Sequence, residues 1–403
     1  MASDALRAFQ QYPVLLLEGA RGAGKHALAR ELSGPRSPSH TFDDAAIRAL
    51  AHDDPSVLLD PKEESLVFRE VQRHPDFLAE LADYIGKSKT PGRVILTTSV
   101  RAELLPMPKR LRKRLKIVTV HTPSHSELFG RGGDWLSLIL RRRMPSPTPS
   151  TRQQLAHLLA RRSDNPSTRL RQSLRSDWID AQLERIATDD APSIGSTQPR
   201  LLRALLDACA TSPTAELNSS ELSRLTGASR GTVDKHLGIL ESLFLLQFLP
   251  GWQDGVTSRP VHRPRLYLAD TRLSAGLGGY SPAELAAPTG HLRLRELMEQ
   301  LVVNELSKQA TVSPVEQRLH HFRDRNGLRV PLIIETPEGI VAVDVHASSR
   351  ITAEVARPLH EFRDRAAGRF RVGVILYMGK AATLGDRLHA LPINSLWEHS
   401  PAR

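Results

Sequence analysis

Three glycines and one lysine near the amino terminus have the types and the spacing that phosphate binding requires. Gly19, Gly22 and Gly24 precede Lys25 in the segment GARGAGK, which follows the pattern G-x-x-x-x-G-K. Glycines let successive backbone N–H groups converge on one anion, and the lysine adds a full positive charge. We expect this loop to hold the phosphates of a nucleotide; the alternative is a glycine-rich turn with a chance lysine. The candidate binding residues are Gly19, Arg21, Gly22, Ala23, Gly24, Lys25 and His26.

The residue after the lysine departs from this pattern. A serine or threonine normally follows, and its hydroxyl binds magnesium. The chain has His26 there, and a neutral imidazole is a poor ligand for a hard ion that prefers oxygen. The sequence therefore predicts phosphate binding but leaves open whether magnesium is bound. We assign no metal ligands.

A second departure follows the apolar run 65–68, which we interpret as a buried strand. In P-loop proteins that hydrolyse ATP, an acid after such a strand holds the metal, and a further residue orients the attacking water. The chain has Arg69 and Glu70 there. Glu70 is the candidate catalytic base, and the alternative is an ordinary acidic residue at the end of a strand.

The elements that must position these residues follow from the apolar pattern. Residues 14–17 form a short apolar run typical of a buried strand, and residues 26–32 suit a helix. A third strand is expected over residues 93–99, ending in Thr97, Thr98 and Ser99. Because ligands of open α/β sheets bind at the carboxyl ends of the strands, these side chains either sense the terminal phosphate or simply end the strand.

Composition limits the class of protein. The chain has 403 residues, of which 40% are hydrophobic, and a formal net charge of +11, so we expect two or three domains. The charge suits solubility and also permits a nucleic-acid surface. The single cysteine, Cys209, excludes a disulfide within the chain. No apolar run approaches the roughly 18 residues of a membrane span, and the first residues do not resemble a secretion signal, so we expect a soluble cytoplasmic protein without membrane contact.

A basic run lies at Lys109–Lys116, with six positive charges in eight positions. Such runs usually form a solvated face. Alternatively, this run contacts nucleic-acid phosphates or supplies an arginine to the nucleotide of a neighbouring subunit.

Residues 201–252 read as a winged helix-turn-helix. Asn218 and Glu221 suit the start of a helix, Gly227 suits the turn, and Ser229 begins the next helix. The outward-facing positions of that helix are expected to be Arg230, Thr232, Lys235 and His236. The pattern favours two alternatives equally: DNA binding, or a helical bundle that only connects domains.

The last third predicts a hairpin of two apolar strands around residues 337–339. The arrangement is similar to the core of restriction-endonuclease-like nucleases, which hold magnesium with acids on both strands. Here Pro331 occupies the first acid position, and Asp344 with His346 replaces the acid and lysine of the second. Glu299 and Glu335 are spare acids. We expect a nuclease-like fold without nuclease activity.

The order of these blocks resembles a large prokaryotic family of AAA-type ATPases fused to a C-terminal domain of unknown function 4143. The resemblance rests on residues 19–25, TFDDAAIRALAHDDPSVLLD, FREVQRHPDFLAEL, PGRVILTTS, RLRKRLKI and PSHSEL. It implies an α/β P-loop NTPase domain of AAA type at 1–140, a helical lid and winged helix at 150–255, and a restriction-endonuclease-like α/β domain at 256–403. It also implies that ATP is the cofactor and that Arg114 contacts the γ-phosphate bound by an adjacent subunit.

Three functional hypotheses follow. The first is an ATP-binding protein with weak or absent hydrolysis, in which nucleotide is a structural or switching ligand. The second is a nucleic-acid-binding or scaffold protein that no longer uses nucleotide, with DNA contacted through the winged helix and Lys109–Lys116. The third is an active ATPase in which Asp43 or Asp44 replaces the metal ligand. A protein partner or a homo-oligomer is compatible with each.

Overall fold

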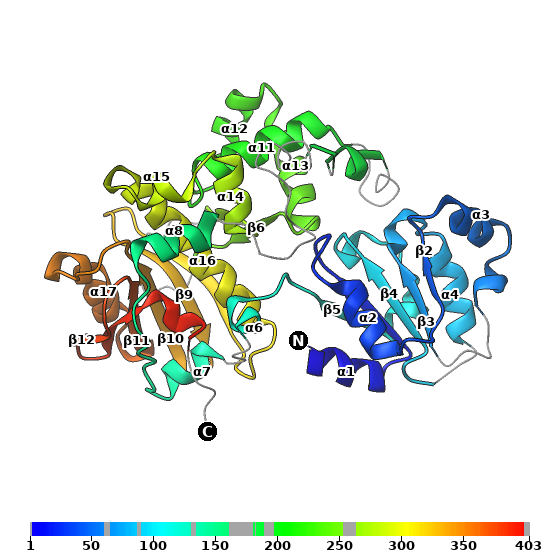
Figure 1. The fold of residues 1–403 in the computed structure, drawn as a ribbon, viewed down its shortest axis with the longest axis horizontal. Coiled ribbons are helices and arrows are strands. Elements are labelled where there is room, and N and C mark those ends of the chain that lie inside the picture. Colours follow the sequence, from blue (N-terminus) through cyan, green and yellow to red (C-terminus); the bar gives the residue numbers. More distant parts are fainter. Residues whose placement is uncertain are drawn as a thin grey trace. The chain divides into compact units, whose positions relative to one another are not determined.

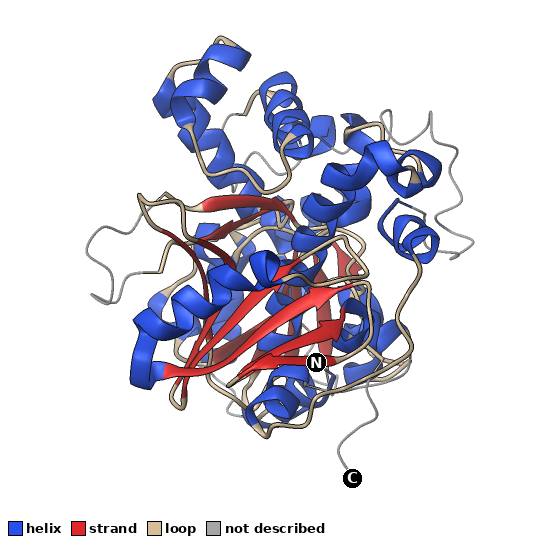
Figure 2. Cartoon of the chain, turned by 90° about the vertical axis from the view of Figure 1, so that its left-hand side faces the viewer, coloured by secondary structure: helices blue, strands red, loops and turns tan. Residues whose placement is uncertain are grey.

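The computed structural model describes residues 2–59, 65–86, 90–129, 134–160, 180–181, 183–188, 197–252 and 263–398. The chain divides into two compact units (Figure 1). The first unit comprises residues 1–122, 178–203 and 234–245, and the second comprises residues 123–177, 204–233 and 246–403. Both units contain a sheet and several helices. Figure 2 draws the strands in red and the helices in blue.

A five-stranded sheet with the order β2-β3-β4-β1-β5 forms the centre of the first unit. Its strands are β1 Val14–Glu18, β2 Ser39–Thr41, β3 Leu66–Arg69, β4 Val94–Thr98 and β5 Leu115–Thr119. All neighbouring strands are parallel. The predicted strands at 14–17, 65–68 and 93–99 are therefore confirmed. Their residues are mostly buried because helices cover both faces of such a sheet.

The helices of the first unit are α1 Ala2–Gln11, α2 Lys25–Ser33, α3 Ala45–Asp53, α4 Phe77–Gly86 and α5 Lys109–Arg112, with short 3-10 turns at Pro55–Leu58, Val71–Arg73 and Ala102–Leu104. On one face of the sheet, Leu28 and Ala29 of α2 pack with Leu17 and Val67. On the opposite face, the rings of Phe68 and Phe77 lie 4.7 Å apart. Residues of β3 therefore alternate between the two faces, as strand geometry requires.

The second unit is built on a six-stranded mixed sheet with the order β12-β13-β11-β10-β9-β8. Its strands are β8 Arg318–Arg323, β9 Arg329–Thr336, β10 Gly339–Val345, β11 Phe370–Tyr377, β12 Ala382–Gly385 and β13 Leu388–Pro392. Strands β9 and β10 form the predicted antiparallel hairpin, and β10 pairs with β11 in parallel.

Two helices cover the two faces of this sheet. Helix α16, His291–Ala310, packs Leu297 and Leu301 against one face together with Val341 and Val343. Helix α17, Ala353–Ala366, packs Leu359 against the other face. The remaining elements of this unit are α6 His125–Leu128, α7 Trp135–Leu140, α8 Arg152–Ala160, α12 Ser219–Thr226, α14 Thr271–Leu277, α15 Pro282–Ala286, β6 Leu246–Leu249 and β7 Arg265–Leu268, with 3-10 turns at Pro288–Gly290, Ala367–Arg369 and Ile393–Leu396.

The middle region has the element order expected for a winged helix-turn-helix. Helices α11 Pro199–Thr211, α12 and α13 Arg230–Ser242 precede the antiparallel pair β6 and β7. Asn218 accepts a hydrogen bond from the N–H of Glu221 at the start of α12, and Gly227 ends that helix in the left-handed conformation, with φ 72°. The assignment to the winged-helix class itself stays a prediction.

The expected outward position of His236 is wrong. Its side chain is buried, and its Nε2 lies 3.2 Å from the backbone N–H of Gln198. Residue 236 follows the buried Val233 by three positions, and residues three apart share one face of a helix. Arg230 and Lys235 are exposed as expected.

Candidate phosphate-binding site

The predicted phosphate loop connects β1 to α2. Gly22 and Gly24 have φ values of 79° and 94°, a region that glycine enters without steric cost. A side chain at Gly19 would place a Cβ 2.1 Å from the carbonyl oxygen of Val120, just after β5. The loop is therefore packed directly against the backbone that follows β5, and the glycine at its first position is required by this close approach.

Lys25 is buried beneath the loop, with 5% of its surface exposed. Its Nζ donates hydrogen bonds to the carbonyl oxygens of Gly19 and Ala20, at 2.7 and 3.0 Å, and to Ser99 Oγ at 3.1 Å. A buried ammonium needs such acceptors because burial removes its water. The contacts fix one full positive charge at the inner side of the turn, beside the amino terminus of α2.

Ser99 joins this ammonium to the candidate catalytic base. Its hydroxyl donates to Glu70 Oε2 at 2.7 Å while it accepts from Lys25. Of the three polar residues expected near the phosphates, Ser99 is therefore the one that contacts the lysine. Thr97 accepts from the backbone N–H of Glu70 at 3.2 Å, and Thr98 bonds to the backbone of Val100.

Glu70 is held by several donors. Its Oε2 also accepts from Gln72 Nε2 at 2.8 Å, and an Arg21 guanidinium nitrogen lies 3.9 Å from that oxygen. Burial would raise the pKa of Glu70, but the charge of Lys25, the hydrogen bonds from Gln72 and Ser99 and the charge of Arg21 together lower it. Glu70 is therefore a stabilised carboxylate with reduced basicity.

Sequence reasoning missed the role of Gln72. Its Oε1 accepts from the backbone N–H of Ser99 at 3.3 Å, so the side chain joins the segments that follow β3 and β4. The only sequence signal is its place two residues after Glu70. The contact between Arg21 and Glu70 was also missed, because it joins two segments that are far apart in the chain.

The two positions expected to handle magnesium carry His26 and Arg69. His26 lies in the first turn of α2, and its pKa is lowered by burial and by the positive charges of Arg69 and Arg30. Arginine has no lone pair to offer a metal, and a neutral imidazole suits transition metals better than magnesium. The residues present therefore do not fit a magnesium ion.

Asp43 and Asp44, the proposed replacement ligands, have other partners. Asp43 forms an ion pair with Arg73 at 2.7 Å, and Asp44 caps α3 by accepting from the N–H of Ala46 at 2.8 Å. Both follow β2, which lies three strands from β1, or about 14 Å at the usual strand spacing. Within the described ranges, no group of three His, Cys, Asp or Glu side chains is arranged to hold a metal ion.

Arg114 precedes β5 and lies at the end of the sheet opposite the loop. Its guanidinium donates to the carbonyl oxygen of Ile85 at 2.6 Å, at the end of α4. In the same basic run, Arg110 forms an ion pair with Asp83 and Arg112 donates to the carbonyl oxygen of Met107 at 3.2 Å. Contact of Arg114 with a phosphate in a neighbouring subunit stays a prediction.

The three acids considered for a nuclease-like site, Asp344, Glu335 and Glu299, also have protein partners. Asp344 accepts from the N–H of Val345 at 2.7 Å, and its other oxygen lies 3.0 Å from His346 Nε2. Glu335 pairs with Arg369 at 2.7 Å. Glu299 is buried and accepts from Arg265 at 2.7 Å, from Tyr267 at 3.0 Å and from Arg329 at 2.7 and 2.8 Å. These neighbours leave the spare acids committed to protein partners.

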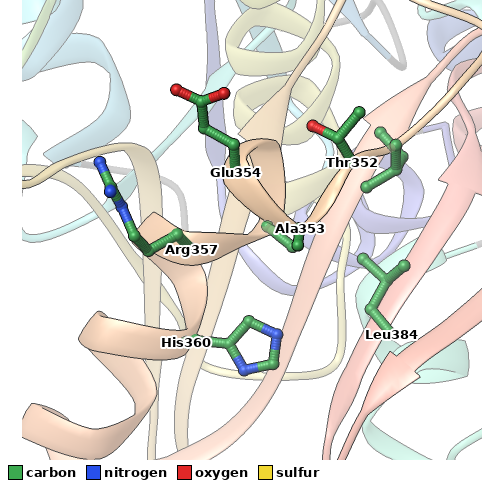
Figure 3. Close-up of a pocket in the computed structure, with 8 residues that line it drawn as sticks. Thr352, Ala353, Glu354, Arg357, His360 and Leu384 are labelled. Atoms are coloured by element: carbon green, nitrogen blue, oxygen red, sulfur yellow. The ribbon is translucent and has the colours of Figure 1, made fainter.

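A pocket of about 470 Å³ lies at the amino-terminal turns of α17 (Figure 3). His360 and the N-cap residue Thr352 line it together with Leu384 of β12, and most of its surface is apolar. Arg357 forms an ion pair along the helix with Glu361, with 3.6 Å between Nε and Oε1. Glu354 and Arg357 also line the pocket, and we assign no function to it.

No described helix is long and apolar enough to cross a membrane.

Comparisons with known proteins identify three domain models in the chain. Residues 11–129 match an AAA domain, residues 164–284 match a domain of unknown function (DUF8612), and residues 295–396 match a domain of unknown function (DUF4143).

Uncharacterized proteins of Mycobacterium bovis and Mycobacterium tuberculosis are each 25% identical to this chain over 337 residues, which is 83% of this chain and 70% of the relative. Among solved structures, a Walker-type ATPase of Pyrococcus abyssi matches with 14% identity and a TM-score of 0.39, covering 68% of this chain and 94% of that one. The RuvB Holliday junction branch migration motor of Thermotoga maritima matches with 15% identity and a TM-score of 0.26, covering 62% and 87%. The chain thus carries an AAA domain at residues 11–129 and a C-terminal DUF4143 domain at residues 295–396.

Proposed function

We propose that this protein binds ATP in the loop at residues 19–26 and hydrolyses it weakly or not at all. The observation that carries the proposal is the chain of contacts from the loop carbonyls through Lys25 and Ser99 to Glu70. It supplies a fixed positive charge for the phosphates, but it also engages Glu70, the candidate carboxylate for activating water. Among the described residues, no group of three His, Cys, Asp or Glu side chains is arranged to hold an ion that would polarise the γ-phosphate. We therefore expect ATP to be bound but hydrolysed slowly or not at all.

Isothermal titration of the full chain with ATP tests the binding. We expect saturable binding by the parent and a loss of at least about tenfold in affinity for Lys25→Ala, because charged hydrogen bonds to phosphate are among the strong ones. A phosphate-release assay tests the proposal of weak or absent hydrolysis. The rates of the parent and of Glu70→Gln should both remain near background. The proposal of nucleotide binding ends if the parent binds no ATP, and rapid release that depends on Glu70 ends the proposal of weak hydrolysis.

DNA binding is a second candidate function. Arg230 and Lys235 are exposed on α13, and the pair β6 and β7 follows that helix in the order of a winged helix. Asp234, which is exposed between them, opposes phosphate contact. Binding of duplex DNA that weakens steeply between about 50 and 200 mM salt, and further in Lys235→Ala, would support this candidate. Binding that ignores both changes would exclude it.

A further inference from the structure

Arg69 lies at the edge of the sheet that carries the phosphate loop, and its guanidinium has no anionic partner among the described residues. Arg69 is half-buried at the end of β3. Over the described ranges, its side chain makes no hydrogen bond and no ion pair, whereas Arg73 nearby pairs with Asp43 at 2.7 Å. A half-buried arginine normally finds a carboxylate, so this one has capacity for an external anion.

Strand geometry aims Arg69 at the loop. Val67, two residues earlier, packs with Leu28 and Ala29 of α2 in one core cluster, so Arg69 rises from the same face of the sheet. Because β3, β4 and β1 are parallel, Arg69 and the loop after Glu18 lie at the same edge. The lowered pKa of His26 agrees with this placement, since the positive charge of Arg69 contributes to it.

The chemistry of a guanidinium suits a triphosphate. In nucleotide-hydrolysing P-loop proteins a divalent cation neutralises the oxygens of the β- and γ-phosphates. An arginine offers up to five N–H donors and pairs with phosphate through two parallel hydrogen bonds. A magnesium ion carried in by ATP would instead meet Arg69 and His26, with repulsion from the first and a poor ligand in the second.

We propose that Arg69 replaces the divalent cation, so that the loop prefers metal-free ATP over its magnesium complex. This inference rests on the proposed function, because it requires that the loop at residues 19–26 binds nucleotide. It adds a specificity: the ligand is the fully ionised triphosphate, and magnesium is a competitor for the phosphate oxygens rather than a helper.

The test compares ATP affinity by isothermal titration in EDTA and in excess magnesium at one ionic strength. We expect the full-length parent to bind several-fold more tightly in EDTA, and Arg69→Gln to lose about tenfold in EDTA. Arg110→Gln is the matched control, because Arg110 is exposed and its ion pair with Asp83 lies away from the loop. Its affinity should change by less than about twofold. The double variant Arg69→Asp, His26→Thr should bind ATP more tightly with magnesium than without it.

The outcomes separate the two proposals. No ATP binding by the parent in either buffer overturns the proposed function. Binding by the parent that is tightened by magnesium, or that is unchanged in Arg69→Gln, overturns the role of Arg69 alone. Circular dichroism and thermal melts establish that each variant is folded. If Arg69→Gln does not fold, the effect of magnesium on the parent decides the question by itself.

Discussion

The hydroxyl of Ser99 is the link between the buried Lys25 and the partly buried Glu70 of the candidate phosphate site, so its removal is the sharpest test of that network. Ser99 is 2% exposed. It donates to Glu70 at 2.7 Å and accepts from Lys25 at 3.1 Å. Ser99→Ala removes only the hydroxyl and keeps Cβ, so the change is confined to the loss of one small atom and its two hydrogen bonds.

A hydrogen bond to a charged group contributes about 1.5 to 3 kcal/mol to stability. Two such bonds are lost in Ser99→Ala, but each ion keeps other partners: Lys25 retains the carbonyls of Gly19 and Ala20, and Glu70 retains Gln72. We therefore expect the local free energy of opening to fall by about 2 kcal/mol, which corresponds to about 30-fold faster hydrogen exchange, since 1.4 kcal/mol is a factor of ten.

Hydrogen exchange followed by mass spectrometry measures this effect segment by segment. Peptides covering α2 and β4 should exchange faster in Ser99→Ala, while peptides covering β9 and β10 of the other unit should keep the parent rate. Ser39→Ala serves as the control, because Ser39 is exposed on β2 and exposed positions contribute little. Parent-like exchange in both α2 and β4 would show that the network does not stabilise the site and would refute the reasoning.

Three further predictions concern stability. Gly19→Ala should lower the thermal midpoint and abolish ATP binding, because its Cβ would lie 2.1 Å from the backbone oxygen of Val120; a parent-like melt would contradict the close approach. His321 is buried, and burial together with the charge of Arg265 lowers its pKa from 6.5 to about 4. Between pH 6.5 and 4, His321 is therefore protonated in the unfolded chain but neutral in the folded chain. The free energy of unfolding should decrease as the pH is lowered through that range. His321→Gln should flatten the dependence in urea titrations read by tryptophan fluorescence, and an equal slope in both proteins would exclude His321 as its source. Glu299→Gln leaves two arginines without their carboxylate and should cost about 3 kcal/mol in the same titration, whereas a change below about 0.5 kcal/mol would mean that this buried network is dispensable.

The local features of the phosphate site could be predicted because they are written in consecutive residues. An apolar run, glycines at fixed spacing and a lysine specify strand, turn and helix within about twenty positions, and the AAA domain match at residues 11–129 agrees with that reading. The hairpin of β9 and β10 was predictable for the same reason, since its turn lies between two apolar runs.

Contacts between distant segments could not be predicted in this way. Glu299 appeared to be a spare acid because Arg265 and Arg329, which neutralise it, lie on strands 30 or more positions away. Gln72 had no motif to mark it. His236 was assigned to the wrong face of α13 because its polarity suggested solvent, although the spacing from Val233 places it inside. In each case the partner, rather than the residue itself, determines the role.

The departure at Arg69 from the metal-binding pattern has an electrostatic meaning. An acid at the end of β3 and a divalent cation bound to it would together add +1 to the charge near the phosphates. Arg69 alone adds the same +1, because replacing a carboxylate by a guanidinium raises the local charge by two, the charge of a magnesium ion. Glu70 remains balanced by Arg21, and Lys25 is unchanged. Under the proposed function, the site therefore keeps its attraction for a triphosphate without a metal, while His26 and Arg69 do not fit the ion that would polarise the γ-phosphate.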